Sequence, residues 1–436
     1  MKAINDFFEV AKHNSTLKKE FFAGLASFLA ISYIIIVNPT VLSAAGMPGN
    51  ALVTSTVLIA AIASIAMGIF AKNPFVIAPG MGINVFFSYT AVGIYGIPWQ
   101  TVLGATLWSG IIFVLLVVFN VRAKLMLSLP DSVKSALGAG VGLFIAYIGF
   151  VDSGFITTTN NLLIIAPITL KTALFLFCLI TLLILYIKKI PAPILIVVVI
   201  GYAIGFGTTY FTANEIINIP SKVFAAPDFS LFMQLDLING AKFAIIPTIF
   251  TFLFLCLFDS TGTIAGLYGS MDKHLDQNDS QLKRTFLVDA TNAGISGIIG
   301  TSPATVVVES GVGIAQGGRT GLTAVFAGLM FLPFLFLAPL ISSIPMEIVA
   351  PSLILIGIMM MQQVTKIQWD DLTQASPAFF TILMMIMSSS IATGIACGIL
   401  SWFFIALFCN RKELNPMSSI IVILCAIMLL HTLSVF

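Results

Sequence analysis

The chain has 436 residues, of which 58% are hydrophobic and only 9% are charged. A soluble domain carries about a quarter charged residues, so this composition excludes a soluble globular protein. The formal net charge of +2 is too small to indicate a nucleic-acid partner. Apolar runs of about 18 residues or more recur along the chain, each long enough to cross a bilayer core of roughly 30 Å, and they predict an all-α polytopic membrane protein.

Seven apolar segments precede a polar gap, and seven follow it. The first 20 residues hold lysines but no small-residue cleavage site, so the run from Phe21 is predicted to be an uncleaved first span. We predict the first set of spans at residues 21–43, 51–71, 76–95, 101–119, 133–150, 170–187 and 191–211. We predict the second set at 242–267, 284–300, 302–315, 320–342, 347–364, 375–392 and 394–409. A last apolar stretch, 417–435, either crosses as a fifteenth helix or lies at the membrane interface.

Basic residues support this count, because they recur after every even-numbered span, where the positive-inside rule places cytoplasmic loops. These residues are Lys72, Arg122, Lys124, Lys188, Lys189, Lys273, Lys283, Arg284, Arg319, Lys366, Arg411 and Lys412. The opposite loops carry few basic residues, with Lys222 the main exception. Seven is odd, so the second set enters from the opposite side, and related sets would form an inverted repeat. Weak similarity between 101–113 and 321–331, and between 73–84 and 300–310, favours a duplication.

Spans 3 and 10 contain helix-breaking residues. Span 3 opens with Pro74, Pro79 and two glycines, and span 10 has Pro303 before the β-branched run 305–308. Proline removes a backbone donor and β-branched residues disfavour a helix, so each span is predicted to form a short extended piece and then a half-helix. Two such breaks in matching positions of two repeats indicate a transport site. The alternative is that these residues only kink helices for packing.

Polar residues stand at the predicted junctions, with Asn84 in span 3 and Glu309 and Ser310 in span 10. Asp259 lies well inside the apolar run of span 8. A carboxylate at the centre of a membrane helix costs at least ~2.5 kcal/mol on insertion scales, so its presence indicates a function. We predict that Asp259 and Glu309 converge in a water-accessible pocket and hold a proton that accompanies a neutral solute. For Asp259 the structural alternative is an interhelical hydrogen bond to a serine or threonine.

Other polar residues carry weaker predictions. Asn38 either caps a break that faces the site or ends the first span. Asp289 and Asn292 are expected to pair with Lys283, Arg284 or backbone.

The sequence predicts neither a cofactor nor a metal site, and it does not predict an enzyme. The histidines do not cluster, there is no P-loop for ATP hydrolysis, and the five cysteines lack a CxxC pair, so we interpret them as free, buried thiols. Among the phenylalanines, Phe86, Phe87 and Phe258 are placed to stack on a base.

Five motifs, spread in order over nearly the whole chain, carry a family resemblance. They are YIIIVNPTVLSAAGMP (33–48), APGMGIN with FFSYT (78–90), LFDSTGT (257–263), TS-x5-VES-x2-G-x-A-x-GGRTGLTAV (301–325) and WDDLTQASPAF (369–379). These motifs resemble the signatures of the adenine/guanine/hypoxanthine permeases, the AzgA-like branch of the nucleobase transporters. The resemblance implies a transporter fold of seven plus seven inverted spans.

The resemblance also implies a division into domains. An N-terminal cytoplasmic segment (1–20) would precede a core domain made of 21–119 and 242–342, and a gate domain made of 133–211 and 347–409. The stretch 417–435 is extra. Alternating access would come from the core moving against the gate, usually in a dimer.

The function implied by the resemblance is proton-coupled uptake of purine bases across the cytoplasmic membrane. Carried over by motif, Gly82, Asn84, Asp259 and Glu309 would bind substrate, and we add Ser310 from its place at the junction; Asp259 and Glu309 would couple the proton. The family usually has an acidic residue at position 256 and an aromatic near 307, where this chain has Cys and Val. This leaves open the choice between adenine and the 6-oxopurines. Sodium in place of the proton, and a same-fold transporter of uracil, xanthine or an inorganic anion, are the alternatives. A rival from another class is a multi-pass scaffold or channel with no coupled solute.

Overall fold

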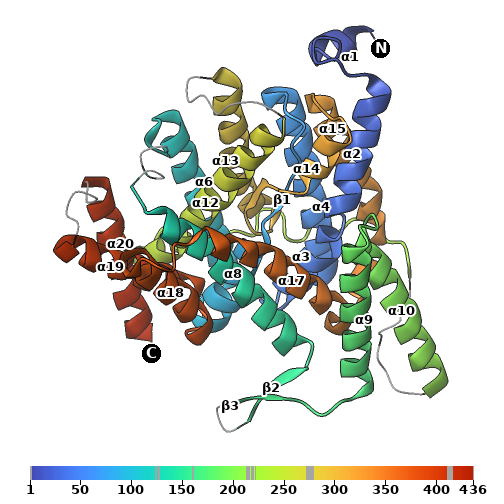
Figure 1. The fold of residues 1–436 in the computed structure, drawn as a ribbon. Coiled ribbons are helices and arrows are strands. Elements are labelled where there is room, and N and C mark those ends of the chain that lie inside the picture. The colour runs from blue at the N-terminus through green and yellow to red at the C-terminus, as the bar shows by residue number, and fades with distance from the viewer. Residues whose placement is uncertain are drawn as a thin grey trace.

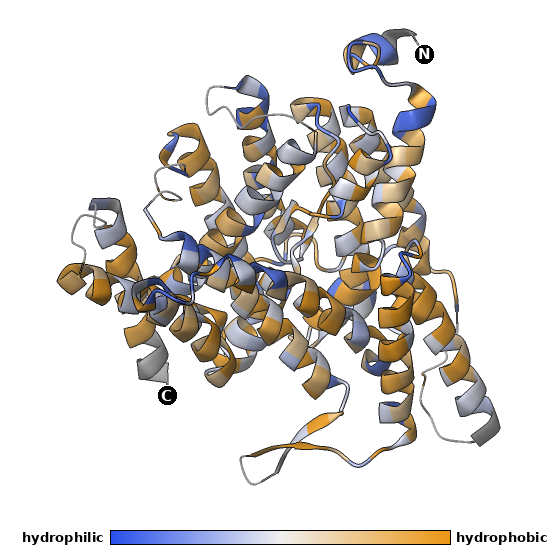
Figure 2. Cartoon of the chain, viewed as in Figure 1, coloured by the Kyte–Doolittle hydropathy of each residue, from blue (hydrophilic) through white to orange (hydrophobic). Residues whose placement is uncertain are grey.

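The computed structural model describes residues 2–122, 125, 128–159, 162–212, 217, 220, 222–271, 279–409 and 416–435. Over these residues the protein is a bundle of helices with a few short strands (Figure 1). Ten of the described helices are long and apolar enough to cross a membrane. Figure 2 shows hydrophobic residues along most of the helices and hydrophilic ones gathered mainly at helix ends, in loops and near the N-terminus. The prediction of a multi-pass membrane protein is confirmed.

The helices and strands follow the predicted spans closely. The first half of the chain forms α1 (Lys2–Phe7), α2 (Leu17–Ile31), α3 (Ile34–Ser43), α4 (Gly49–Ala66), η1 (Met67–Ala71), β1 (Ile77–Pro79), α5 (Met81–Val85), η2 (Phe86–Ile94), α6 (Trp99–Val118), α8 (Asp131–Asp152), β2 (Ile156–Thr159), β3 (Leu162–Ile165), α9 (Leu170–Ile187) and α10 (Pro193–Thr212). The second half forms α11 (Leu237–Gly240), η3 (Phe243–Ile245), α12 (Ile246–Ser270), α13 (Ser280–Ile299), β4 (Ala304–Val306), α14 (Ser310–Ala315), α15 (Gly321–Phe331), η4 (Leu332–Leu337), α16 (Ala338–Ser342), α17 (Met346–Met361), η5 (Gln362–Lys366), α18 (Leu372–Met387), α19 (Ile391–Cys409) and α20 (Pro416–Val435).

Two details of the span predictions change. The first span begins at Leu17 and is interrupted between α2 and α3, where Ser32 and Tyr33 stand. The last apolar stretch forms one helix, α20, which packs on α19 and α12. Lys124, Lys273, Arg411 and Lys412, which contribute to the predicted topology, lie outside the described residues.

The helices pack into two groups. The strand-bearing group consists of α2 to α6 with η1, η2 and α11 to α16, together with β1 and β4; the outer group consists of α8, α9, α10, α17, α18 and α19. Glycines let helices approach closely in both groups, as expected for packing between membrane helices. A Cβ on Gly110 of α6 would overlap the backbone of Gly294 on α13, and a Cβ on Gly357 of α17 would lie 2.5 Å from the carbonyl oxygen of Gly142 on α8.

The two predicted extended pieces pair with each other. β1 and β4 form a two-stranded antiparallel sheet in the register Ile77 with Val306, Ala78 with Thr305 and Pro79 with Ala304. The pairing continues at both ends, where Val307 N–H donates to Val76 at 3.1 Å and Gly80 N–H donates to Pro303 at 3.3 Å. From this sheet, the helical segment α5–η2 leads toward one end of the bundle and α14 toward the end with the basic loops. The prediction of a strand followed by a half-helix in both spans is confirmed.

Three peripheral features complete the fold. Strands β2 and β3, in the loop after α8, form an antiparallel hairpin that we did not predict. Before α2, Glu9 pairs with Lys12 and, at 3.7 Å, with Lys72; the hydrogen bond and charge of Lys12, and then the charge of Lys72, lower the pKa of Glu9. The cysteines are free, as predicted, but Cys409 is exposed and Cys397 half-buried, because the former ends α19 where helix packing stops.

Candidate functional site

Glu309 is the residue immediately before α14, so it stands at the predicted junction between extended chain and half-helix. Its Oε1 atom accepts a hydrogen bond of 2.6 Å from the hydroxyl of Tyr33. Tyr33 is buried at the interruption between α2 and α3, near the middle of the first span. The interruption therefore brings a phenolic donor from the first span to the carboxylate of the tenth.

Asp259 lies in the middle of α12 and faces the same region. Its Oδ2 atom accepts a hydrogen bond of 3.2 Å from Thr305 Oγ1 of β4, and Asp259 interacts electrostatically with Glu309 and with Tyr33. Protein atoms surround the carboxylate, yet the residue is exposed to solvent. The carboxylate of Asp259 is therefore in the middle of the helix without being enclosed by the bundle.

The helix surfaces that continue from these carboxylates toward the basic loops are open. On α12, Gly262 and Gly266 lie on the same face as Asp259, are exposed, and have no atom within 4 Å of an added Cβ. On α14, Val308 before the helix is 59% exposed and Val312 within it is 44% exposed. Both helices lead toward the predicted cytoplasmic end, so the exposed faces extend from the two carboxylates in that direction.

The glycines at the start of α5 allow backbone to border the site. A Cβ on Gly80 would lie 3.3 Å from Asp259 Oδ2, so the backbone passes directly beside this carboxylate. A Cβ on Gly82 would lie 2.5 Å from Val141 Cγ1, because α8 of the outer group packs on this point. The half-buried Gly82 therefore lies where the two helix groups meet.

Asn84 and Ser310 are placed differently from the two carboxylates. Asn84 lies in the first turn of α5 rather than at the junction, is fully buried, and its Oδ1 atom accepts a hydrogen bond from Ser302. The hydroxyl of Ser310 is also buried and accepts a hydrogen bond of 2.9 Å from Val76 N–H. In this structure both side chains hold the broken segments in place.

Other buried polar residues near β1 and β4 make hydrogen bonds within the protein. Asn38 neither caps a break nor ends a helix: it lies inside α3 and donates to Thr56 Oγ1 at 2.6 Å and to Thr301 Oγ1 at 3.1 Å. Asp289 accepts a 2.8 Å hydrogen bond from the backbone N–H of Val306, which agrees with the backbone alternative. Asn292 likewise donates to a backbone carbonyl of its own helix.

Two of the three phenylalanines predicted to stack on a base do not border the site. Phe86 and Phe87 are fully buried and pack on Phe252, because the start of η2 turns them into the core against α12. Phe258 is half-buried, packs on Phe254 with the two rings tilted, and precedes Asp259 in the chain. Among the described residues, no group of three or more His, Cys, Asp or Glu side chains could hold a metal ion.

Tyr33 is the site residue that sequence reasoning missed. It stands at the start of the motif YIIIVNP, in an apolar run where a tyrosine is usually packing material. The sequence signal for Tyr33 was a polar hydroxyl group in the middle of an apolar span, because a buried tyrosine hydroxyl requires a hydrogen-bond partner. No local feature of the sequence names Glu309 as that partner.

Comparison with known proteins identifies the family. Residues 18–397 match the family model described as the permease family. The chain belongs to the permease family.

Two relatives match this permease over nearly its full length. It is 35% identical over 422 residues to the adenine permease AdeQ of Escherichia coli, covering 94% of this chain and 93% of the relative. It is 34% identical over 430 residues to the guanine/hypoxanthine permease PbuG of Bacillus subtilis, covering 94% and 96%. Relatives that are permeases are transport proteins rather than enzymes, and the permease is a multi-pass protein of the cell membrane.

A solved structure shares the fold of the permease. The transmembrane domain of a cyanobacterium bicarbonate transporter, BicA, aligns with a TM-score of 0.62 at 15% sequence identity, covering 88% of this chain and 97% of that one. At this identity the likeness concerns the fold alone. The permease has the predicted seven-plus-seven inverted-repeat fold, in which β1 and β4 are the matching interruptions of the two halves.

Proposed function

We propose that this permease imports purine bases, with a proton as the coupling ion. The observation that carries the proposal is the cluster of Glu309, Asp259 and Tyr33 midway through an apolar bundle, where the backbone at Gly80 passes beside Asp259. Relatives named as adenine and guanine/hypoxanthine permeases support the choice of ligand.

Glu309 is suited to recognise a purine. A carboxylate accepts the N–H groups that every purine base carries on its rings, and charge-assisted hydrogen bonds are roughly twice as strong as neutral ones. Tyr33 holds one carboxylate oxygen with its 2.6 Å bond and leaves the other for substrate. Gly80 lies beside Asp259, so the peptide groups at the start of α5 can approach a flat ligand that the two carboxylates bind.

Asp259 is suited to carry the proton. It lies within the electrostatic reach of Glu309, and two neighbouring carboxylates do not readily ionise together, so the pair holds a proton more readily than either alone. A proton bound there neutralises the site while a neutral base is bound. In this proposal Asn84 and Ser310, both buried, orient the half-helices instead of touching the base.

The two helix groups supply the moving parts. We propose that the strand-bearing group is the transport core and that the outer group is the gate, because the site residues all belong to the first group and Gly82 touches α8 of the second. Sliding of the core against the gate would then expose the site to each side in turn. A homodimer joined through the gate is part of the same proposal, and light scattering of the purified protein tests it.

An inorganic anion is the rival cargo on this fold. The bicarbonate transporter shares the architecture, but an anion site is expected to lack carboxylates and to present a basic residue between the half-helices. Here Asp259 and Glu309 occupy the centre of the site. The acidic cluster favours a neutral ligand that donates hydrogen bonds.

Reconstituted protein tests this proposal directly. Uptake of labelled adenine and hypoxanthine is measured in proteoliposomes with an imposed pH gradient, acid outside, with a sodium gradient, and with neither. We expect purine accumulation only with the pH gradient, and none of labelled bicarbonate or sulfate. Accumulation under the sodium gradient alone would reassign the coupling ion, and anion uptake would overturn the proposed cargo.

A further inference from the structure

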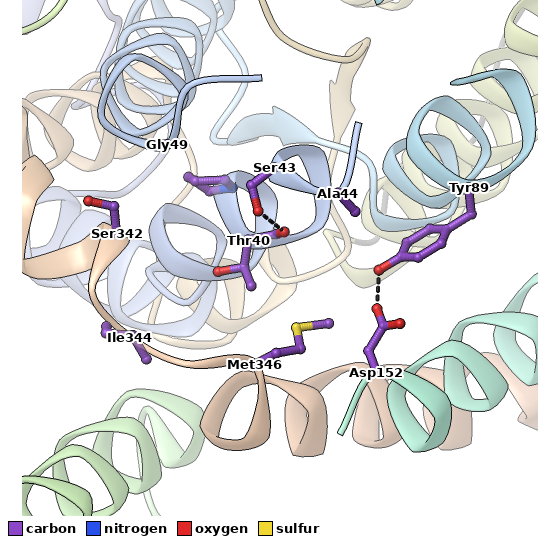
Figure 3. Close-up of a pocket in the computed structure, with 10 residues that line it drawn as sticks. Thr40, Ser43, Ala44, Gly49, Tyr89, Asp152, Ser342, Ile344 and Met346 are labelled. Carbon is purple, nitrogen blue, oxygen red and sulfur yellow. Dashed lines mark hydrogen bonds between the residues drawn. The ribbon is translucent and has the colours of Figure 1, made fainter. Parts of the chain in front are cut away.

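A pocket of about 440 Å³ lies between the core and the gate at the end opposite the basic loops (Figure 3). Thr40 and Ser43 of α3 line it from the core, and Met346 of α17 lines it from the gate. The connections after α3 and before α17 contribute to its walls, and both are predicted to be extracellular. We refer to this space as the outer pocket.

Tyr89 and Asp152 close one side of the outer pocket. Figure 3 shows the Tyr89 side chain from η2 pointing at the Asp152 carboxylate, which stands at the end of α8. The Tyr89 hydroxyl donates a hydrogen bond to Asp152 Oδ2. This bond joins the core to the gate, so it cannot survive a large movement of one against the other.

Two weaker hydrogen-bond contacts also join the core to the gate on this side. Thr90 Oγ1 donates to the carbonyl oxygen of Ser389 at 3.4 Å, and the hydroxyls of Tyr95 and Ser390 lie 3.1 Å apart within hydrogen-bonding distance. Both serines lie between α18 and α19 of the gate. Three contacts, from Tyr89 and Thr90 of η2 and from Tyr95 just after it, therefore join the core to the gate on this side.

The inner side differs from the outer side. The faces of α12 and α14 that continue from Asp259 and Glu309 toward the basic loops are exposed, as Gly262 and Val312 show. An exposed inner side together with a hydrogen-bonded outer side is what we expect of the inward-facing arrangement of an alternating-access transporter. The hydrogen bonds that Tyr89, Thr90 and Tyr95 make to the gate are therefore what distinguishes the outer end from the inner end.

We propose that the outer pocket receives the purine base from outside and that the Tyr89–Asp152 hydrogen bond is the latch between this pocket and the central site. The latch residues have the chemistry to bind a base once they part. The Tyr89 ring offers a stacking surface, and the Asp152 carboxylate accepts ring N–H groups. The identity of the occupant rests on the proposed function, whereas the latch itself does not.

The latch is tested without any substrate. Val312→Cys places a reporter on the exposed inner face of α14. Its initial rate of labelling by a membrane-impermeant maleimide is measured in inside-out vesicles, after subtracting the labelling of protein without the reporter. Tyr89→Phe and Asp152→Asn should each slow this labelling by up to about tenfold, because a lost hydrogen bond to a charged group shifts the population toward the outward-facing state.

Three comparisons make the result specific. Tyr186→Phe, the same change on an exposed tyrosine of α9, should leave labelling unchanged. The double variant of Tyr89 and Asp152 should slow labelling no more than Tyr89→Phe alone, because phenylalanine already removes the hydrogen bond that asparagine only weakens. If one single variant fails to accumulate in the membrane, the other tests the bond from the opposite side. Unchanged labelling in the variants that fold, or additive effects in the double variant, would overturn the latch.

The occupant of the outer pocket has its own test. With purine outside, Asp152→Asn should raise the external concentration for half-maximal uptake severalfold, and Tyr186→Phe should not. An unchanged half-saturation overturns the pocket as a purine site. Failure of the unmodified protein to take up purines would overturn the proposed function and the identity of this occupant, while leaving the labelling result for the latch standing.

Discussion

Tyr33 and Glu309 are 276 residues apart in the sequence and are joined by a 2.6 Å hydrogen bond in the middle of the bundle. The donor comes from the interruption of the first span and the acceptor from the broken tenth span. Neither residue has this role without the other, because the carboxylate needs a donor at this depth and the buried phenol needs an acceptor.

Replacing Tyr33 with phenylalanine keeps the ring and removes the donor to Glu309. We expect the purine concentration for half-maximal uptake to rise about tenfold, since a hydrogen bond to a charged group is worth about 1.5 kcal/mol or more, with a smaller change in maximal rate. Kinetics in proteoliposomes separate the two parameters. Tyr147→Phe, the same change on a half-buried tyrosine of α8, is the control; equal effects of both variants would rule out a specific role for Tyr33.

Replacing Glu309 with glutamine keeps the size of the side chain and removes its charge. Purine uptake should fall at least about tenfold while the amount of protein in the membrane stays the same, because the amide is a weaker acceptor for ring N–H groups. Uptake normalised to immunodetected protein measures this. A variant that transports at the normal rate would refute the binding role.

Replacing Asp259 with asparagine should separate transport from its driving force. An imposed gradient, acid outside, should no longer raise internal purine above external purine, whereas exchange of labelled for unlabelled purine should continue. The expected direction follows from the coupling: outside acid loads the carboxylate with a proton before inward movement, and asparagine cannot be loaded. Glu347→Gln, which affects a carboxylate paired with Lys171 away from the site, should still accumulate purine. Persistent gradient-driven accumulation by the Asp259 variant would assign the proton elsewhere.

Replacing Gly82 with alanine should obstruct the contact between core and gate. The new methyl group would lie 2.5 Å from Val141 Cγ1, and overpacking of this kind costs about 1 to 3 kcal/mol. We expect transport to fall sharply and Val141→Ala, which makes room, to restore part of it. Gly207→Ala on α10, where a Cβ meets nothing within 4 Å, is the matched control. Lack of rescue by Val141→Ala would show that the fault is not steric.

Glu20 provides a test of stability rather than transport. This buried carboxylate of α2 accepts hydrogen bonds from Arg319 N–H at 3.1 Å, Thr320 N–H at 3.3 Å and Thr323 Oγ1 at 2.5 Å, and so caps α15. Glu20→Ala leaves these donors buried without a partner and should cost about 3 kcal/mol, while Glu20→Gln costs less. Thermal denaturation in detergent measures the difference, with Glu9→Ala, at a partly exposed carboxylate, as control. Similar melting of all three variants would contradict the capping role.

The broken spans and the two carboxylates could be predicted from the sequence because their signals are local. Pro79 and Pro303 interrupt a helix wherever it packs, and a charge such as Asp259 is costly anywhere in an apolar span. These arguments need no knowledge of neighbours. They led correctly to the strands, the half-helices and the shared location of Asp259 and Glu309.

The directions of neighbouring side chains could not be predicted, because they depend on distant partners. Ser310 follows Glu309 in the chain, yet its hydroxyl accepts a hydrogen bond from Val76 N–H just before β1, while Glu309 faces the site. Asn84 is similarly turned toward Ser302. One step along a helix rotates a side chain by about 100°, so a junction residue identified by position alone has an undetermined orientation.

The antiparallel pairing of β1 with β4 has a consequence for biogenesis. Ile77 leaves the ribosome long before its partner Val306, so the first half of the chain must reside in the membrane with unsatisfied backbone groups until the second half has been inserted. A truncated protein that ends before α11 should be recognised by quality-control proteases and degraded. Co-expression of the two halves as separate polypeptides should rescue both, because each one supplies the strand that the other lacks.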